Sequence, residues 1–239
     1  MLTLLFVELR KLKGSLVVIL CLAAPTVVTA FLAMMALRMA PMSWNEAVSN
    51  ATGLWAFFMM PMTITALSIL LAQVEHGPRA WDHILALPIP RWRLFAAKAV
   101  VMMLLVGLMS LLLLAETRLV GVLVGKIAPA KAYAGAFPWR PTLEVLGSMW
   151  GASWFMGMLQ LWTAIRFRSF VAPMALGLGG TFVAVAASGA KEAIFVPWAM
   201  PVAILANQGA RSLLAFELGV IGGIVTLLLM LLHLSRREA

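Results

Sequence analysis

Long stretches of mainly apolar residues with few charges recur along almost the whole chain. Six of them are long enough to cross a bilayer, because a membrane-spanning helix needs about 20 apolar residues. They lie at 14–37, 47–74, 99–124, 145–165, 169–190 and 212–235. We therefore predict an all-α membrane protein in which residues 1–239 form a single transmembrane domain of six helices.

A seventh apolar stretch, 193–210, differs from the six predicted spans. It contains residues that interrupt helices or need hydrogen-bond partners, namely Pro197, Pro201, Asn207, Gln208 and Gly209. Such a segment is stable at membrane depth only where protein shields its backbone. We predict a re-entrant hairpin before the sixth span.

The composition agrees with a membrane protein and excludes most other classes. Of 239 residues, 63% are hydrophobic and 11% are charged, whereas about a quarter of the residues of a soluble domain are charged. The spans leave no room for a soluble catalytic domain, and the segment 121–127, GVLVGKI, lacks the spacing and the final Ser or Thr of a phosphate-binding loop. We expect no catalytic residue, no metal site and no cofactor in this chain.

The net charge of +9 is expected to face anionic lipid headgroups, since no nucleic-acid-binding motif is present. Basic residues flank the spans and are commoner on the cytoplasmic side of membrane proteins. With the N-terminus inside, most of them are cytoplasmic: Arg10, Lys11, Lys13, Arg79, Arg91, Arg93, Lys98, Arg166, Arg168, Arg236 and Arg237. We predict a multi-pass protein with both termini in the cytoplasm.

Residues 1–13, MLTLLFVELRKLK, have the pattern of an amphipathic helix. Leucines recur at helical spacing on one side, while Glu8, Lys11 and other charges occupy much of the opposite side. The segment is too short to span a bilayer, so we predict a helix lying at the cytoplasmic interface. It serves either as an anchor that sets topology or, through Glu8, as a contact for a partner subunit.

The predicted cytoplasmic loop 75–98 is the densest cluster of charge, proline and aromatic residues in the chain. Gly77 and Pro78 end the second span, and Pro88 stops a short amphipathic helix predicted over residues 79–87. Trp81 lies on one face of that helix. The helix either lies on lipid or inserts into a groove of another protein.

These two segments resemble the membrane subunit of type 2 ABC exporters. The resemblance rests on ELRKLKGS at 8–15 and on Glu75, Gly77, Trp81 and the run LALPIPRWRLFAAK within 75–98. Within that class the chain is most similar to the small permeases of bacterial lantibiotic and bacitracin immunity transporters. The resemblance implies a location in the bacterial plasma membrane and a self-immunity role in exporting a peptide antibiotic.

The resemblance also implies partners and sites. The permease pairs with a second permease, the same or a homologous chain, on two copies of a cytoplasmic ABC ATPase, which binds ATP and Mg. The loop between spans two and three is then the coupling helix. The implied ATPase-coupling residues are Glu8, Glu75, Gly77, Trp81, Asp82, Leu85, Pro88 and Arg91.

Polar and aromatic residues near the spans indicate a candidate substrate path. Glu116 and Arg118 are costly if they lie at membrane depth, but they are ordinary headgroup residues if the third span ends at Ala115. The remaining candidates are Trp150, Trp154 and Gln160, although tryptophan is also common at membrane interfaces.

The sequence supports a transport subunit of an ATP-driven exporter of an amphiphilic substrate. The alternative is a non-transporting scaffold or sensor that uses the same loop for docking. A proton-driven carrier is disfavoured because the spans lack an acidic residue at their centre. The cargo and the choice between a homodimer and a heterodimer stay open.

Overall fold

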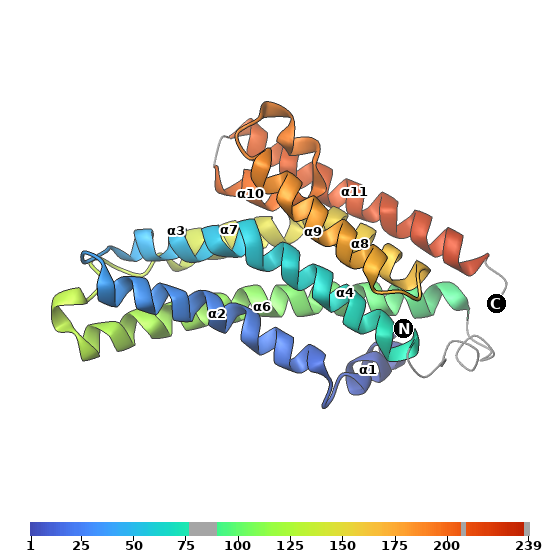
Figure 1. Ribbon diagram of the computed structural model, residues 1–239, viewed down its shortest axis with the longest axis horizontal. Coiled ribbons are helices and arrows are strands. Elements are labelled where there is room, and N and C mark those ends of the chain that lie inside the picture. Colours follow the sequence, from blue (N-terminus) through green and yellow to red (C-terminus); the bar gives the residue numbers. More distant parts are fainter. Residues whose placement is uncertain (77–89, 207–208, 237–239) are drawn as a thin grey trace.

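The computed structural model describes residues 1–76, 90–206 and 209–236, and its regular elements there are helices. The helices α2 (Leu16–Arg38), α4 (Met60–His76) and α6 (Arg91–Ile127) pack against one another along the length of the molecule, as Figure 1 shows. The helix α11 (Ala210–Ser235) lies on the opposite side of the bundle. Its C-terminal end and the N-terminal helix lie at the same end of the molecule.

The N-terminal segment forms α1 (Leu2–Lys11), as its amphipathic pattern predicts. Gly14 follows with a φ of 76°, a conformation that glycine adopts without steric cost. The side chain of Ser15 then caps α2 by accepting a hydrogen bond from the Val17 N–H at 3.3 Å. The chain therefore turns sharply between the interface helix and the first long helix.

The second long apolar segment is one continuous helical element with a wide turn in its middle. It comprises α3 (Trp44–Leu54), the π-helical turn η1 (Trp55–Met59) and α4. A reciprocal capping box between Ser43 and Glu46 fixes its start. The wide turn ends at Met59, two residues before Pro61, whose missing N–H removes one α-helical hydrogen bond.

The helix α6 is longer than the predicted span 99–124. It has 37 residues and at 1.5 Å per residue extends about 55 Å, well beyond a hydrocarbon core of about 30 Å. The predicted loop 75–98 is accordingly too long at both ends: Glu75 belongs to α4, and Arg91 begins α6. Runs of uncharged residues predict helices that are too short where the charged residues of a helix have partners inside the protein.

The predicted span 145–165 is an interrupted helix. The helices α7 (Trp139–Ala152) and α8 (Trp154–Arg166) meet at Ser153. The helix α11 passes close to this break, because a Cβ atom at Gly219 would lie 2.5 Å from the Ala152 backbone. The glycine allows two helix backbones to approach closely, as is common in membrane helices.

The last part of the chain contains shorter pieces. The predicted span 169–190 is α9 (Val171–Ala186), and the predicted hairpin contains the 3-10 turns η3 (Lys191–Phe195) and η4 (Pro197–Ala199) and the helix α10 (Met200–Leu205). These pieces pack on α9, α7 and α11. The prolines thus divide this segment, as the sequence predicts.

Four helical segments of the described chain are long and apolar enough to cross a membrane. They are Leu16–Arg38, Trp44–His76, Arg91–Ile127 and Ala210–Ser235. The helix Val171–Ala186 is apolar but shorter. The chain is therefore an all-helical, multi-pass membrane protein, and the six-span arrangement remains a prediction.

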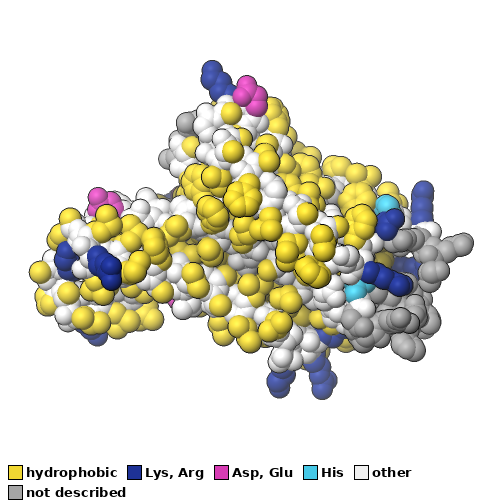
Figure 2. Space-filling model, in the orientation of Figure 1, with side chains coloured by type: hydrophobic (Ala, Val, Ile, Leu, Met, Phe, Trp, Pro, Cys, Tyr) yellow, Lys and Arg dark blue, Asp and Glu magenta, His cyan; other side chains and the backbone are white. Residues whose placement is uncertain are grey.

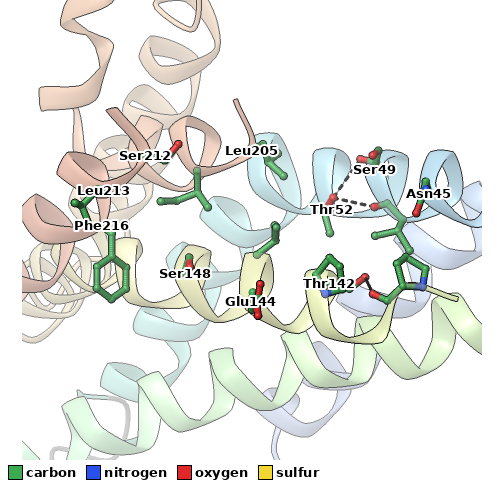
Figure 3. A pocket seen from close by; sticks show the side chains of 15 residues that line it. Asn45, Ser49, Thr52, Thr142, Glu144, Ser148, Leu205, Ser212, Leu213 and Phe216 are labelled. Atoms are coloured by element: carbon green, nitrogen blue, oxygen red, sulfur yellow. Dashed lines mark hydrogen bonds between the residues drawn. The ribbon is translucent and has the colours of Figure 1, made fainter. Parts of the chain in front are cut away.

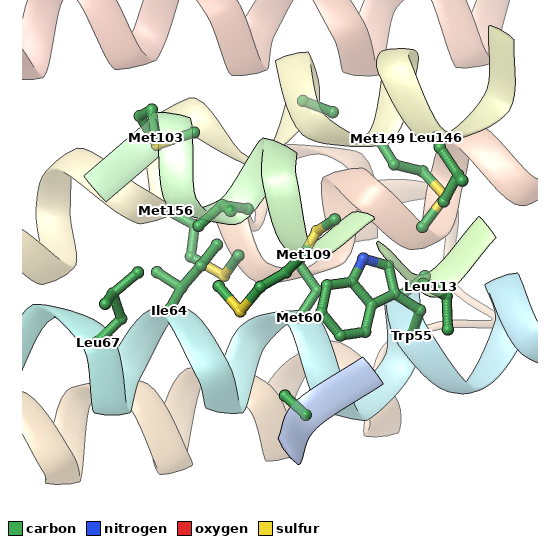
Figure 4. Close-up of a cluster of buried hydrophobic side chains, with 14 of the residues drawn as sticks. Trp55, Met60, Ile64, Leu67, Met103, Met109, Leu113, Leu146, Met149 and Met156 are labelled. Atoms are coloured by element: carbon green, nitrogen blue, oxygen red, sulfur yellow. The ribbon is translucent and has the colours of Figure 1, made fainter. Parts of the chain in front are cut away.

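The core lies between α4, α6, α7 and α8 and is rich in methionine, as Figure 4 shows. Trp55 is fully buried there, and its indole N–H donates a hydrogen bond to Ser110 Oγ at 3.2 Å. Hydrophobic side chains also cover much of the outer surface, whereas charged ones gather mainly at its margins (Figure 2). This distribution suits a protein surrounded by lipid.

Candidate functional site

Four charged residues from three helices form a compact cluster where α1 meets α4 and α6. The cluster, called the ionic cluster below, consists of Glu8 and Lys11 of α1, Glu75 of α4 and Lys98 of α6. Two carboxylates and two ammonium groups balance each other in charge. The ionic cluster joins helices that are far apart in the sequence.

Lys98 is at the centre of the ionic cluster. Its Nζ lies 3.1 Å from Glu8 Oε2 and donates a hydrogen bond to Glu75 Oε1 at 3.0 Å. A third hydrogen bond, of 3.0 Å, goes to the carbonyl oxygen of Leu71. An ammonium group has three protons to donate, so Lys98 is fully satisfied.

Lys11 completes the ionic cluster from its more open side. Its Nζ donates to Glu75 Oε1 at 2.9 Å and also contacts Glu8. The side chain of Lys11 is 27% exposed, whereas those of Glu75 and Lys98 are each 3% exposed. Burial of such charges is tolerated only when they are paired and hydrogen-bonded.

The surroundings shift the pKa values of the two charged groups contributed by α1. Burial alone would raise the pKa of Glu8, but Lys98 and Lys11 outweigh it and hold that pKa below its ordinary value. Burial alone would lower the pKa of Lys11, but Glu8 and Glu75 raise it above its ordinary value. Both groups are therefore charged at neutral pH.

The end of α4 is also fastened on its other side. The His76 ring contacts the carbonyl oxygen of Ala164 in α8 at 3.3 Å, and the Gln73 amide donates to the carbonyl of Arg168 at 3.3 Å. Residues 77–89 follow His76, and α6 begins at Arg91. Polar contacts thus hold the end of α4 before this connection, and Lys98 holds α6 seven residues after Arg91.

The predicted coupling residues divide into two groups. Glu8 and Glu75 meet in the ionic cluster, and Arg91 begins α6. The others lie outside the described residues: Gly77, Trp81, Asp82, Leu85 and Pro88. The sequence interpretation did not identify Lys11 and Lys98 as partners of the glutamates. Lys98 does carry a signal, because it lies in the otherwise apolar run FAAKAVVMM.

Glu116 and Arg118 lie within α6, since this helix continues past Ala115 to Ile127. Glu116 is half-buried and accepts hydrogen bonds from the α2 hydroxyls of Thr26, at 3.0 Å, and Thr29, at 2.9 Å. Glu116 is 18 residues beyond Lys98, about 27 Å at the rise of an α-helix. This separation is close to the thickness of a hydrocarbon core, which is about 30 Å.

Arg118 faces a different neighbourhood from Glu116. Its guanidinium lies 5.1 Å from the ring centroid of Trp44 and 5.7 Å from that of Phe137. Trp44 and Phe137 pack edge to face with centroids 5.0 Å apart. Arg118 thus joins an aromatic group at the end of α6 opposite the ionic cluster.

The other three candidates for a substrate path serve partly as packing residues. The indole N–H of Trp150 donates to the carbonyl of Met103 at 2.8 Å, and Trp154 packs on Trp150 with ring centroids 5.4 Å apart. These two tryptophans line a groove of about 220 Å³ beside α6. Gln160 is fully buried and donates to the carbonyl of Pro173 at 2.6 Å, so it joins α8 to α9.

The described residues contain no group of three or more His, Cys, Asp or Glu side chains that could hold a metal ion. The chemistry of the ionic cluster is that of a structural joint: it fixes three helices and presents no nucleophile. The arrangement connects α1, α4 and α6 to one another.

A comparison with protein families gives a match over most of the chain. The sequence profile of a family described as "ABC-2 family transporter protein" matches residues 4–184. The match includes the whole ionic cluster and the connection between α4 and α6. No curated protein and no solved structure matches the chain.

Proposed function

Because the chain belongs to the ABC-2 family of transporter proteins, we propose that it is the permease subunit of an ATP-driven exporter of an amphiphilic substrate. The family supports a membrane transport subunit that is not itself an enzyme and that generally works with a cytoplasmic ATPase. In this proposal a separate ABC ATPase binds ATP and Mg and supplies the energy.

The ionic cluster is the observation that carries the coupling proposal. It joins α4 and α6, the two helices that flank residues 77–89, to the interface helix α1. A displacement of residues 77–89 by a partner would act on α4 and α6 together, and α1 would follow. Glu8 and Glu75 then act as positioning residues, while Trp81, Asp82 and Leu85 contact the ATPase.

The proposed assembly contains two copies of the ATPase and a second permease, identical or homologous. In this proposal the chain has six spans, with α7 and α8 forming one interrupted span, so both termini are on the same side, which is the cytoplasmic side of a bacterial plasma membrane. The location of α1 and of the end of α11 at one end of the molecule supports this arrangement (Figure 1). The proposed cargo is a peptide antibiotic to which the transporter confers self-immunity.

Co-purification tests the coupling proposal directly. Trp81→Ala combined with Asp82→Arg should reduce recovery of the ATPase with the permease in mild detergent at least tenfold. Trp92→Ala is a matched control, because Trp92 is 46% exposed on α6 outside the predicted coupling helix. Unchanged recovery and unchanged transport in the double variant would overturn the assignment of residues 79–87.

A scaffold or sensor is the second candidate, because docking alone also needs the loop. Stimulation of the ATPase by a cationic peptide antibiotic in proteoliposomes supports export, whereas ATPase binding without stimulation supports the scaffold. Bacterial survival with and without the permease tests the immunity role. Identical sensitivity to every peptide antibiotic tested would contradict that role.

A further inference from the structure

A large cavity lies at the end of the bundle away from the ionic cluster. It has a volume of about 780 Å³ and is lined by α3, α7, α10 and α11, as Figure 3 shows. Small-molecule sites typically measure about 300–1,000 Å³. The cavity is therefore of the size that an amphiphile with a short chain would fill.

The side of the cavity formed by α3 and α7 carries polar side chains among valines and prolines. The walls formed by α3 and α7 carry Asn45, Ser49 and Ser148, whose side chains make no hydrogen bond to the described part of the chain. By contrast, Thr52 and Thr142 donate to backbone carbonyls of their own helices at 2.8 and 2.6 Å. Three polar groups are thus available to a ligand.

The opposite wall is mainly apolar. Leu205 of α10 and Leu213 and Phe216 of α11 line it, and Phe216 lies beside Ser148 of α7 (Figure 3). Leu213 is 59% exposed and Phe216 is 36% exposed. A hydrocarbon chain lying on these side chains would gain van der Waals contacts with them.

The rim carries a carboxylate. Glu144 is 63% exposed, and its Oε1 lies 2.8 Å from Nε of Arg140, which is 90% exposed. An exposed pair of this kind contributes little energy, so an incoming ammonium group can compete for Glu144. Among the described residues that line the cavity, Glu144 is the only one with a charged side chain.

We propose that this cavity binds a cationic amphiphile, with the ammonium group at Glu144, hydrogen bonds to Ser49 and Ser148, and the hydrocarbon part on Leu213 and Phe216. The inference rests on the proposed function, since it names a substrate class for the exporter. It also assigns a place on the chain that the sequence interpretation did not identify.

Direct binding to the permease alone tests this proposal. The probes are dansyl-1,8-diaminooctane, which carries an ammonium group, and dansyl-8-aminooctanol, which carries a hydroxyl group at the same position. Both are titrated into phosphatidylcholine nanodiscs with and without the permease. We expect saturable fluorescence binding above that of empty nanodiscs, with a Kd at least threefold lower for the ammonium probe.

Variants then locate the site. Ser148→Phe should raise the Kd of both probes at least tenfold by filling the cavity, and Ser49→Leu should do so from α3 if the first variant misfolds. Glu144→Gln should remove the difference between the probes. Glu217→Gln is the matched control, because Glu217 is an exposed carboxylate on α11 outside the cavity.

Three results would overturn the proposal. The first is probe fluorescence with the permease that equals that of empty nanodiscs. The second is a Kd that neither Ser148→Phe nor Ser49→Leu changes. The third is loss of permease dimers in Ser148→Phe when the natural permease binds no probe. The last result would show that a second copy occupies the cavity. Since no ATPase is present, each failure is distinct from failure of the co-purification experiment.

Discussion

Lys98 Nζ and Glu8 Oε2 lie 3.1 Å apart and connect α6 to α1 across 90 residues of sequence. Lys98 is 3% exposed and Glu8 is 7% exposed. Several apolar side chains of α1, by contrast, remain open, and Leu2 is 83% exposed. The interface helix is therefore joined to the bundle by a specific charge contact as well as by apolar packing.

Removal of the central ammonium group should separate these helices. Lys98→Met leaves the carboxylates of Glu8 and Glu75 buried with only Lys11 as a partner, and breaking a buried pair costs about 3–5 kcal/mol. We expect a clear loss of thermal stability, measured by intrinsic tryptophan fluorescence in nanodiscs. Hydrogen exchange in residues 2–11 should rise at the same time.

The matched control for this variant is Lys126→Met on the same helix, because Lys126 is exposed. Its free energy of unfolding should lie within about 0.5 kcal/mol of that of the natural protein. The triple variant Glu8→Gln, Glu75→Gln and Lys98→Met should recover part of the lost stability, because no unpaired buried carboxylate remains. If Lys98→Met alone melts like the control, the ionic cluster does not hold the three helices together.

Acid should weaken the attachment of α1, and the sign follows from the two pKa shifts. Glu8 has a pKa below its ordinary 4.5, so its contribution is complete above that pH and is lost as the pH falls through the lower folded value. Lys11 has a pKa above its ordinary 10.5, so its contribution is complete below that pH and is lost in stronger base. Between these two pH values the stability that Glu8 and Lys11 contribute should not change with pH.

The measurement is the melting temperature between pH 3 and pH 8 for the natural protein, Glu8→Gln and Glu217→Gln. The natural protein and the Glu217 control should lose stability together below about pH 4.5. Glu8→Gln should start lower and show a smaller further loss. Parallel acid profiles for all three proteins would contradict the role given to Glu8.

The sequence predicts the helices better than it predicts their contacts. Apolar runs locate α2, α4, α6 and α11, because lipid requires helices of a minimum length. They do not reveal that Lys98 pairs with Glu8 and Glu75, since this pairing depends on how separate helices pack. The interruption at Ser153 has no proline to mark it. The polar wall of the cavity has no local motif either.

Close backbone contact at Gly219 should be essential for packing α11 on α7. A leucine there would place its Cβ 2.5 Å from the Cα and the carbonyl oxygen of Ala152, which are backbone atoms and cannot rotate away. We expect Gly219→Leu to destabilise the fold by about 1–3 kcal/mol or more. Gly179→Leu is the control, because nothing lies within 4 Å of a Cβ at that position. Equal melting temperatures for the two variants would show that α11 does not pack this closely.

Glu116 offers a test that separates function from stability. Its partners have alternative acceptors: Thr26 Oγ1 is 2.8 Å from the carbonyl oxygen of Leu22, and Thr29 Oγ1 is 3.2 Å from that of Pro25. In Glu116→Leu both hydroxyls keep these backbone bonds, and a carboxylate that is costly near lipid is removed. The melting temperature should therefore fall little or even rise.

Transport should respond differently if Glu116 contributes to the substrate path. We expect ATP-dependent transport of a cationic peptide by proteoliposomes to fall about tenfold in Glu116→Leu, which corresponds to about 1.4 kcal/mol. Glu217→Leu, on the exposed side of α11, should transport at the natural rate. If Glu116→Leu is stable and transports normally, Glu116 does not belong to the substrate path. It is then a residue of the headgroup region, where a carboxylate is solvated and contacts no cargo.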